Sequence, residues 1–168
     1  MSHLVAPSLL AADFSNLASE VEMINEGAAD WLHLDIMDGV FVPNISFGFP
    51  VIEAVRDLSE KPLDVHLMII DPDRFLGRLR DAGATNLTGH YETCPNLHRT
   101  GSEIRKLGMK AGVTLNPHSP VVLLKDILPY LDMVLLMTVN PGYGRQTFTP
   151  GSIHKIGELR SMIDEGGY

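Results

Sequence analysis

Short apolar runs typical of β-strands recur along the chain at roughly 25-residue intervals. They span residues 4–10, 31–37, 63–69, 86–90, 110–115 and 133–139. The segments between them carry apolar residues at helical spacing, as over 17–28 and 153–163. This alternation predicts repeated βα units, in which helices cover a parallel sheet.

Three residue pairs mark expected helix starts. They are Asp71-Pro72, Ser119-Pro120 and Thr149-Pro150. In each pair a side chain that can accept a capping hydrogen bond precedes a proline, which suits the first helical position. We therefore expect a helix to begin at each of these three places.

Polar residues on the predicted strands decide between two α/β architectures. The strands of an open doubly wound sheet are covered on both faces by apolar helices, whereas a barrel has an interior that its strands line. Polar residues that point inward on adjacent strands favour a (β/α)8 TIM barrel over an open sheet. A complete barrel needs about 200 to 250 residues, so we expect this chain of 168 residues to hold about six of the eight βα units.

The length and composition indicate one domain. Apolar residues make up 45% of the 168 positions, enough for one well-filled core, and the chain is too short for two ordinary domains. No linker or shift in composition divides it. We expect a single barrel domain over 1–168, truncated at its C-terminal end.

The charge and the cysteine content limit the classes of binding partner and the cellular compartment that we expect. The formal net charge is −8 and no cluster of lysine and arginine offsets it, which argues against nucleic acid or an anionic membrane as the main partner. Cys94 is the single cysteine, so no intramolecular disulfide can form. We find neither a secretory signal nor an apolar stretch long enough to span a membrane, and we expect a cytoplasmic protein.

The most informative segment for chemistry is the strand over 31–37. Strand alternation points His33, Asp35 and Met37 to one face of a strand that is otherwise apolar. His66 follows on the next strand, and neighbouring strands lie about 4.8 Å apart. The side chains of His33, Asp35 and His66 can therefore converge on one metal ion, and Zn²⁺, Fe²⁺, Mn²⁺ and Co²⁺ all suit two imidazoles and a carboxylate. The alternative is two core histidines hydrogen-bonded to an aspartate.

Three methionines stand near the ends of predicted strands: Met37, Met68 and Met137. A methionine is usually an adaptable core residue. Three of them beside a metal site can also form a dry, polarizable floor under a substrate.

The turn after the last predicted strand is rich in glycine. It contains Gly142, Tyr143, Gly144 and Arg145. Glycine lets backbone N–H groups approach an oxyanion, and the loop after a late barrel strand is a recurrent phosphate position. We interpret this segment either as a tight loop or as a phosphate-binding loop in which Arg145 adds positive charge.

Ser8, His90 and Asn116 also lie where strands are expected to end. Ser8 can hydrogen-bond a substrate hydroxyl or can be satisfied by the backbone. We interpret His90 and Asn116 as structural residues or as residues that support the site.

Several motifs in one order give the chain a close resemblance to the ribulose-phosphate 3-epimerase family, whose members are (β/α)8 barrels. The resemblance covers essentially all 168 residues. Its motifs are Ala-Pro-Ser-Leu-Leu-Ala-Ala-Asp-Phe at 6–14, His-Leu-Asp-Ile-Met-Asp-Gly at 33–39, Phe-Val-Pro-Asn at 41–44, Asp-Val-His-Leu-Met at 64–68, His-Arg-Thr at 98–100 and Val-Asn-Pro-Gly at 139–142.

The resemblance implies reversible epimerisation at C3 of a ketopentose phosphate, D-ribulose 5-phosphate to D-xylulose 5-phosphate, through an enediolate. It assigns one divalent metal ion to His33, Asp35 and His66, and makes Asp35 an acid/base as well. Ser8 and His66 match substrate contacts, and the segment 142–145 matches part of the phosphate cradle. Met37, Met68 and Met137 match a thioether floor. We also expect a homo-oligomer with a small sugar phosphate as substrate.

Two departures from the family pattern stand out. The family loop usually reads Gly-Phe-Gly-Gly, where this chain has Tyr143 and Arg145. The family's second acid/base is an aspartate in a Val-Asp-Gly-Gly strand that would follow Tyr168. Inversion at carbon needs a proton from the opposite face, and an unclosed six-strand sheet leaves apolar edges exposed. We therefore expect residues 1–168 alone to be poorly soluble, inactive or completed by another polypeptide.

Two other functions are compatible with these residues. One is an epimerase for a six-carbon ketose phosphate, or a lyase of the same barrel group. The other is a barrel that binds metal or sugar phosphate without turnover.

Overall fold

The computed structural model describes residues 3–168, which form one parallel sheet with helices outside it. The strand order is that of the sequence: β1 (Leu32–Met37), β2 (Leu63–Met68), β3 (Ala84–His90), β4 (Lys110–Leu115) and β5 (Met133–Leu136). Each strand pairs in parallel with the next. Consecutive parallel strands need crossover connections, and the intervening helices supply them.

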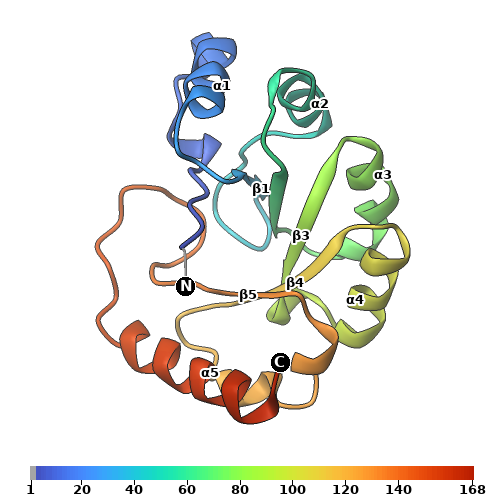
Figure 1. Ribbon diagram of the computed structural model, residues 1–168, viewed down its shortest axis with the longest axis vertical. Coiled ribbons are helices and arrows are strands. Elements are labelled where there is room, and N and C mark those ends of the chain that lie inside the picture. Colours follow the sequence, from blue (N-terminus) through green and yellow to red (C-terminus); the bar gives the residue numbers. More distant parts are fainter. Residues whose placement is uncertain (1–2) are drawn as a thin grey trace.

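Five α-helices surround the strands (Figure 1), from α1 and α2 at the top of the view to α5 at the bottom. They are α1 (Leu17–Glu26), α2 (Phe49–Leu58), α3 (Leu76–Asp81), α4 (Leu97–Lys106) and α5 (Ser152–Gly166). Short 3-10 helices lie before α1, α3 and α4 and in the connection between β4 and β5. They span Leu9–Ala11, Phe14–Asn16, Pro72–Phe75, Tyr91–Thr93, Val121–Leu124 and Leu128–Tyr130. The predicted alternation of strand and helix is confirmed from 31 onwards.

The core lies between the strands and the helices. Leu32 and Leu34 of β1 are buried in the larger core cluster, which also holds Val21 of α1 and Ile52 of α2. A second cluster joins the end of β4 to α5, where Leu159 is buried. The apolar side of β1 thus faces the helices, and the alternating residues His33, Asp35 and Met37 face the other way, as strand geometry predicts.

The first predicted strand is wrong. Residues 4–10 run beside β1, with the N–H of Trp31 bonded to Val5 O and that of His33 to Pro7 O. However, the only bridge in this segment joins Ser8 to His33, and the chain then turns into the 3-10 helix at Leu9–Ala11. Pro7 has no N–H to donate, and the Ser8 hydroxyl accepts from Leu10 N instead, so the ladder stops.

The predicted caps also differ from those observed. A helix begins at Pro72 with Asp71 at its capping position, as predicted, but Asp71 adopts a left-handed conformation (φ 47°) and its side chain makes no capping bond. Pro120 and Gly151, rather than Ser119 and Thr149, occupy the capping positions of the 3-10 helix at Val121–Leu124 and of α5. The last strand is shorter than predicted, because β5 ends at Leu136 and the chain leaves the sheet soon afterwards.

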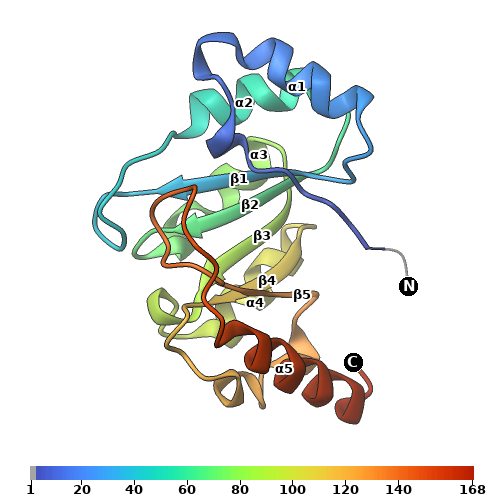
Figure 2. The same cartoon turned by 90° about the vertical axis from the view of Figure 1, so that its left-hand side faces the viewer.

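The segment that follows β5 returns across the carboxyl ends of the strands. Figure 2 shows it rising from β5 toward β1 before it descends into α5. Two hydrogen bonds hold it there: Asn44 Nδ2 donates to Gly142 O (2.8 Å) and the Tyr143 hydroxyl donates to Pro43 O (2.6 Å). The loops after β1 and β5 therefore meet above the sheet.

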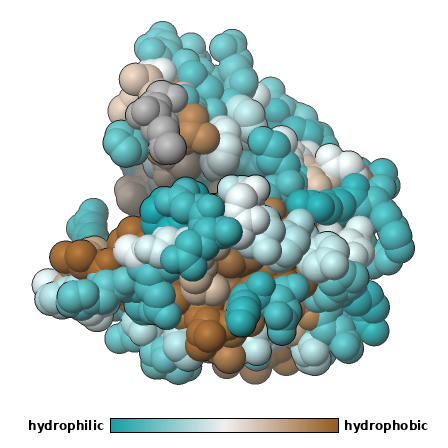
Figure 3. Space-filling view, turned by 60° about the horizontal axis from the view of Figure 1, so that its bottom comes forward, coloured by the Kyte–Doolittle hydropathy of each residue, from teal (hydrophilic) through white to brown (hydrophobic). Residues whose placement is uncertain are grey.

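Helix α5 carries apolar residues on its outer side as well as toward the core. Ile153 and Ile156 are 62% and 47% exposed, whereas Leu159 is buried. Figure 3, which brings this lower side of the molecule forward, shows apolar patches among hydrophilic residues. None of the helices in residues 3–168 combines the length and the apolar character needed to cross a membrane.

Candidate active site

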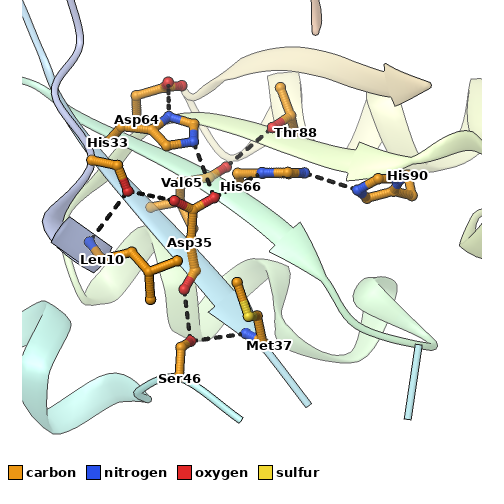
Figure 4. A network of polar contacts seen from close by, with 11 residues as sticks. Leu10, His33, Asp35, Met37, Ser46, Asp64, Val65, His66, Thr88 and His90 are labelled. Carbon is orange, nitrogen blue, oxygen red and sulfur yellow. Dashed lines mark hydrogen bonds and ion pairs between the residues drawn. The ribbon is translucent and has the colours of Figure 1, made fainter. Parts of the chain in front are cut away.

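The pairing of β1 with β2 brings the predicted metal ligands together. Asp35 lies opposite His66 in the parallel register. Nε2 of His33 is 3.3 Å and Nδ1 of His66 is 3.0 Å from the same oxygen, Oδ1 of Asp35. Figure 4 shows both rings pointing toward this carboxylate. Two imidazole nitrogens thus converge on one carboxylate oxygen, on the face of the sheet that points away from the helices.

Two further side chains orient this group. Oδ2 of Asp64 lies 2.7 Å from Nδ1 of His33, so the other ring nitrogen of His33 is directed at Asp35. The Ser8 hydroxyl donates to Oδ2 of Asp35 at 2.5 Å. Both oxygens of Asp35 are therefore engaged, and the carboxylate is held in one orientation.

The two histidines differ in their electrostatic surroundings. Burial disfavours the charged form of His33, but the carboxylates of Asp35 and Asp64 outweigh it and raise the pKa of His33 to about 9. Burial dominates at His66 and lowers its pKa to about 4. Burial opposes ionisation of Asp35, yet the two histidines lower its pKa below the ordinary value. His66 is thus neutral at physiological pH, as a metal ligand must be.

The three side chains could hold a metal ion. One ligand atom from each of His33, Asp35 and His66 lies within 4.8 Å of the others. Two imidazole nitrogens and a carboxylate oxygen form a donor set that suits a first-row divalent metal. The donor set and its convergence therefore fit such an ion.

A cavity of about 550 Å³ opens beside this group. Among residues 3–168, Asp35 is the only carboxylate that lines it. The sequence-predicted residues that line it are Ser8, Asp35, Met37, Met68, Met137, Gly142, Tyr143, Gly144 and Arg145. His33 and His66 lie behind Asp35 and are not in its lining. All the predicted site residues are thus in the cavity wall or directly behind it.

The three methionines take the predicted positions. Met37 and Met68 end β1 and β2, lie opposite each other in the register and are 4% and 2% exposed. Met137 follows β5 directly and bonds through its N–H to Leu115 O. Together they make an apolar wall beside Asp35.

The predicted phosphate loop, residues 142–145, also lines the cavity. Gly142 adopts φ 120° and lies against Val42, so a side chain at this position would be strained. Arg145 adopts φ 59°, a conformation that suits glycine better than arginine. Its side chain is exposed at the cavity mouth.

Comparison with known proteins identifies the relatives of this chain. Residues 4–168 match the model of the ribulose-phosphate 3-epimerase family. The chain belongs to this family. It is 52% identical to ribulose-phosphate 3-epimerase of Bacillus subtilis, over 97% of this chain and 75% of the relative. It is 49% identical to that of Synechocystis, over 98% and 72%.

Members of the ribulose-phosphate 3-epimerase family are isomerases, and this protein is an enzyme of that class by its membership. A chloroplastic ribulose-5-phosphate-3-epimerase of Arabidopsis thaliana is 43% identical over 98% of this chain and 59% of the relative. The resemblance inferred from the motifs is confirmed.

Solved structures confirm the barrel fold of this epimerase-family chain. Mutant tryptophan synthase α-subunits of Pyrococcus furiosus align with TM-scores of 0.68 and 0.69 over 95% of this chain and 74% of theirs. The sequence identity is 14% in both cases, so the likeness is one of fold. The predicted α/β barrel architecture is therefore confirmed.

Sequence reasoning missed one supporting residue of the epimerase-family site. Asp64 stands two positions before His66 and shares its strand face, which is the signal that could have revealed it. His90 was predicted to be structural or supporting, and the structure places its ring 2.9 Å from that of His66, nitrogen to nitrogen.

Proposed function

We propose that this protein acts on C3 of a ketopentose phosphate and interconverts D-ribulose 5-phosphate and D-xylulose 5-phosphate. The observation that carries this proposal is the position of Asp35. Its carboxylate lines the cavity and at the same time contacts both histidines of the candidate metal group. Family membership supports the substrate class, because the curated relatives are named for this reaction.

We assign one divalent metal ion to His33, Asp35 and His66. The C3 hydrogen is on the carbon bonded to the C2 carbonyl carbon, and removal of this hydrogen as a proton generates an enediolate. A bound ion would supply positive charge that stabilises this developing negative charge.

Asp35 is the proposed base on one face of the substrate. The Ser8 hydroxyl donates to one of its oxygens and holds the carboxylate facing the cavity. A carboxylate placed within reach of C3 can take the proton and return it to the same face. Because Asp35 is the only carboxylate in the cavity lining of residues 3–168, we expect exchange of the C3 hydrogen on one face to exceed net inversion.

The remaining cavity residues have binding roles in this proposal. Met37, Met68 and Met137 exclude water from the reacting carbons, since thioethers neither donate protons nor hydrate strongly. The backbone N–H groups of 142–145 and the Arg145 guanidinium bind the phosphate. Ser8 lines the cavity beside Asp35, where it can contact a hydroxyl group of the sugar. His66 lies outside this lining and is buried, so we assign it to the metal ion only.

Binding measurements test the substrate class. The metal-loaded protein should bind D-ribulose 5-phosphate and D-xylulose 5-phosphate more tightly than six-carbon ketose phosphates, and should bind D-ribulose without phosphate most weakly. Titration calorimetry with each sugar measures this order. Equal affinity for five- and six-carbon ketose phosphates would overturn the assignment to ketopentose phosphates.

A further inference from the structure

The polar contacts continue beyond the metal group to a buried histidine that the proposed reaction does not use. His90 ends β3 and is completely buried. Its Nε2 lies 2.9 Å from Nε2 of His66, and the two rings stack with centroids 5.0 Å apart. Figure 4 shows the ring of His66 between Asp35 on one side and His90 on the other.

A carboxylate lies at the far end of this pair. Oε2 of Glu92 is 3.3 Å from Nδ1 of His90. Oε1 of Glu92 accepts from the N–H of Asn116 (3.1 Å) and from the Ser119 hydroxyl. Burial opposes ionisation of Glu92, but its hydrogen bonds with His90 and Ser119 lower its pKa to about 2. Glu92 is thus an anion that can only accept hydrogen bonds.

Only one hydrogen can lie between the two Nε2 atoms, and this couples the tautomers of the two rings. In one arrangement His66 carries hydrogen on Nδ1, facing Asp35, and His90 donates from Nε2. In the other, His66 donates from Nε2, and His90 carries its hydrogen on Nδ1, facing Glu92. Asp35 and Glu92 therefore compete, since each favours the arrangement in which it accepts a hydrogen bond.

A metal ligand requires the second arrangement. Nδ1 of His66 is the nitrogen that faces Asp35 and the candidate metal position. It can bind a metal only through a free lone pair, so its hydrogen must be on Nε2. His90 must then accept at Nε2, and its Nδ1–H must find an acceptor, which Glu92 supplies.

We propose that His90 and Glu92 are positioning residues that give His66 the Nε2–H tautomer, in which Nδ1 presents its lone pair to the metal ion. This inference rests on the metal site proposed above. The alternative is that His90 and Glu92 only provide each other with a hydrogen-bond partner in a buried position. The two explanations differ in what a change at Glu92 does to the proton on His66.

Glu92→Gln tests the proposal, because it keeps the shape of the side chain and replaces the carboxylate by an amide. The amide oxygen can keep the hydrogen bonds from Asn116 and Ser119, which turns the amide NH2 toward Nδ1 of His90. That nitrogen must then accept, so His90 carries hydrogen on Nε2 and His66 carries it on Nδ1. The variant changes almost no volume but reverses the tautomer. Metal affinity, measured with Co²⁺ against a competing chelator, should fall by about 10- to 100-fold.

A second background separates the tautomer from the negative charge of Glu92. In His90→Gln the amide oxygen can accept from Nε2–H of His66 without any relay to Glu92. Adding Glu92→Gln to this background should therefore weaken Co²⁺ binding by much less than in the native background. Equal losses in both backgrounds would show that Glu92 acts only through its charge, and would overturn the proposal.

Nitrogen NMR of the histidine side chains in the native protein needs no variant. With Zn²⁺ bound, His66 should carry its hydrogen on Nε2 and His90 on Nδ1. Hydrogen on Nε2 of His90 in the zinc-loaded protein would overturn the proposal. Failure of the native protein to bind Zn²⁺ or Co²⁺ would instead contradict the metal site itself, on which the proposal rests.

Discussion

Asp64 on β2 lies 2.7 Å from Nδ1 of His33 on β1, while Nε2 of the same ring lies 3.3 Å from Asp35. His33 is therefore flanked by two carboxylates on adjacent strands. This arrangement directs the ring at the candidate metal position and also favours its protonated form. The same contacts that orient the ligand make a proton compete with the metal.

The first prediction concerns the pH dependence of metal binding. Below a pKa of about 9, His33 carries a proton, and a doubly protonated imidazole has no lone pair for a metal. Binding must then release one proton, so the affinity should rise by about tenfold per pH unit and level off near the pKa. His66 contributes no slope in the neutral range, since its pKa is lowered to about 4.

Chelator competition with Zn²⁺ or Co²⁺ across this range measures the slope. Asp64→Asn removes one of the two carboxylates, so the affinity should level off at a lower pH in this variant. A flat profile from neutral pH upwards would contradict the protonation of His33.

The second prediction concerns the contact between the two loops above the cavity. The Tyr143 hydroxyl donates to Pro43 O at 2.6 Å. Tyr143→Phe removes this single hydrogen bond, so sugar phosphate binding should weaken by roughly 2- to 5-fold, given the usual net value of a neutral hydrogen bond. Calorimetric titration with D-ribulose 5-phosphate measures the change. Unaltered or tighter binding would show that the contact does not support the phosphate loop.

The third prediction concerns packing inside the sheet. A Cβ at Gly112 of β4 would overlap Cγ2 of Thr88, a completely buried residue on β3. Gly112→Ala should therefore lower the free energy of unfolding by about 1 to 3 kcal/mol. Gly157 in α5 has no heavy atom near such a Cβ, and Gly157→Ala should raise it by about 1 kcal/mol.

Urea denaturation of the two alanine variants measures both effects. Both substitutions add the same methyl group, so the opposite signs expected for the two changes in unfolding free energy come from the surroundings of each glycine. A stabilising Gly112→Ala would contradict the close contact between β3 and β4.

The fourth prediction concerns Cys94. The thiol is buried, and this burial raises its pKa to about 12. Thiol reagents act on the thiolate, so Cys94 should react with a disulfide reagent only as fast as the protein unfolds, and at full rate in denaturant. Rapid stoichiometric labelling of the folded protein would show that the thiol is accessible.

The centre of the site could be predicted from the sequence because it depends on short-range rules. Strand alternation fixes which of His33, Asp35 and Met37 share a face, and consecutive βα units place β1 beside β2. These two rules are enough to bring His66 next to Asp35, and the observed register agrees.

Other features depend on contacts that the sequence pattern does not encode. Residues 4–10 look like a strand, yet Pro7 and the Ser8 hydroxyl end the ladder after one bridge. Ser119 was expected to cap a helix but donates to Glu92, which is 27 positions away. Such choices between local and distant partners are decided by the packed structure.

The central claim is that Asp35 removes the C3 hydrogen of a ketopentose phosphate. The direct measurement is proton NMR of D-ribulose 5-phosphate in deuterated water with the Co²⁺- or Zn²⁺-loaded protein. Deuterium should enter C3 faster than with the metal ion alone, and Asp35→Asn should slow this exchange by at least about 100-fold. Equal exchange by the native protein and by Asp35→Asn, or no exchange by a native protein that has bound both metal and sugar, would contradict the account.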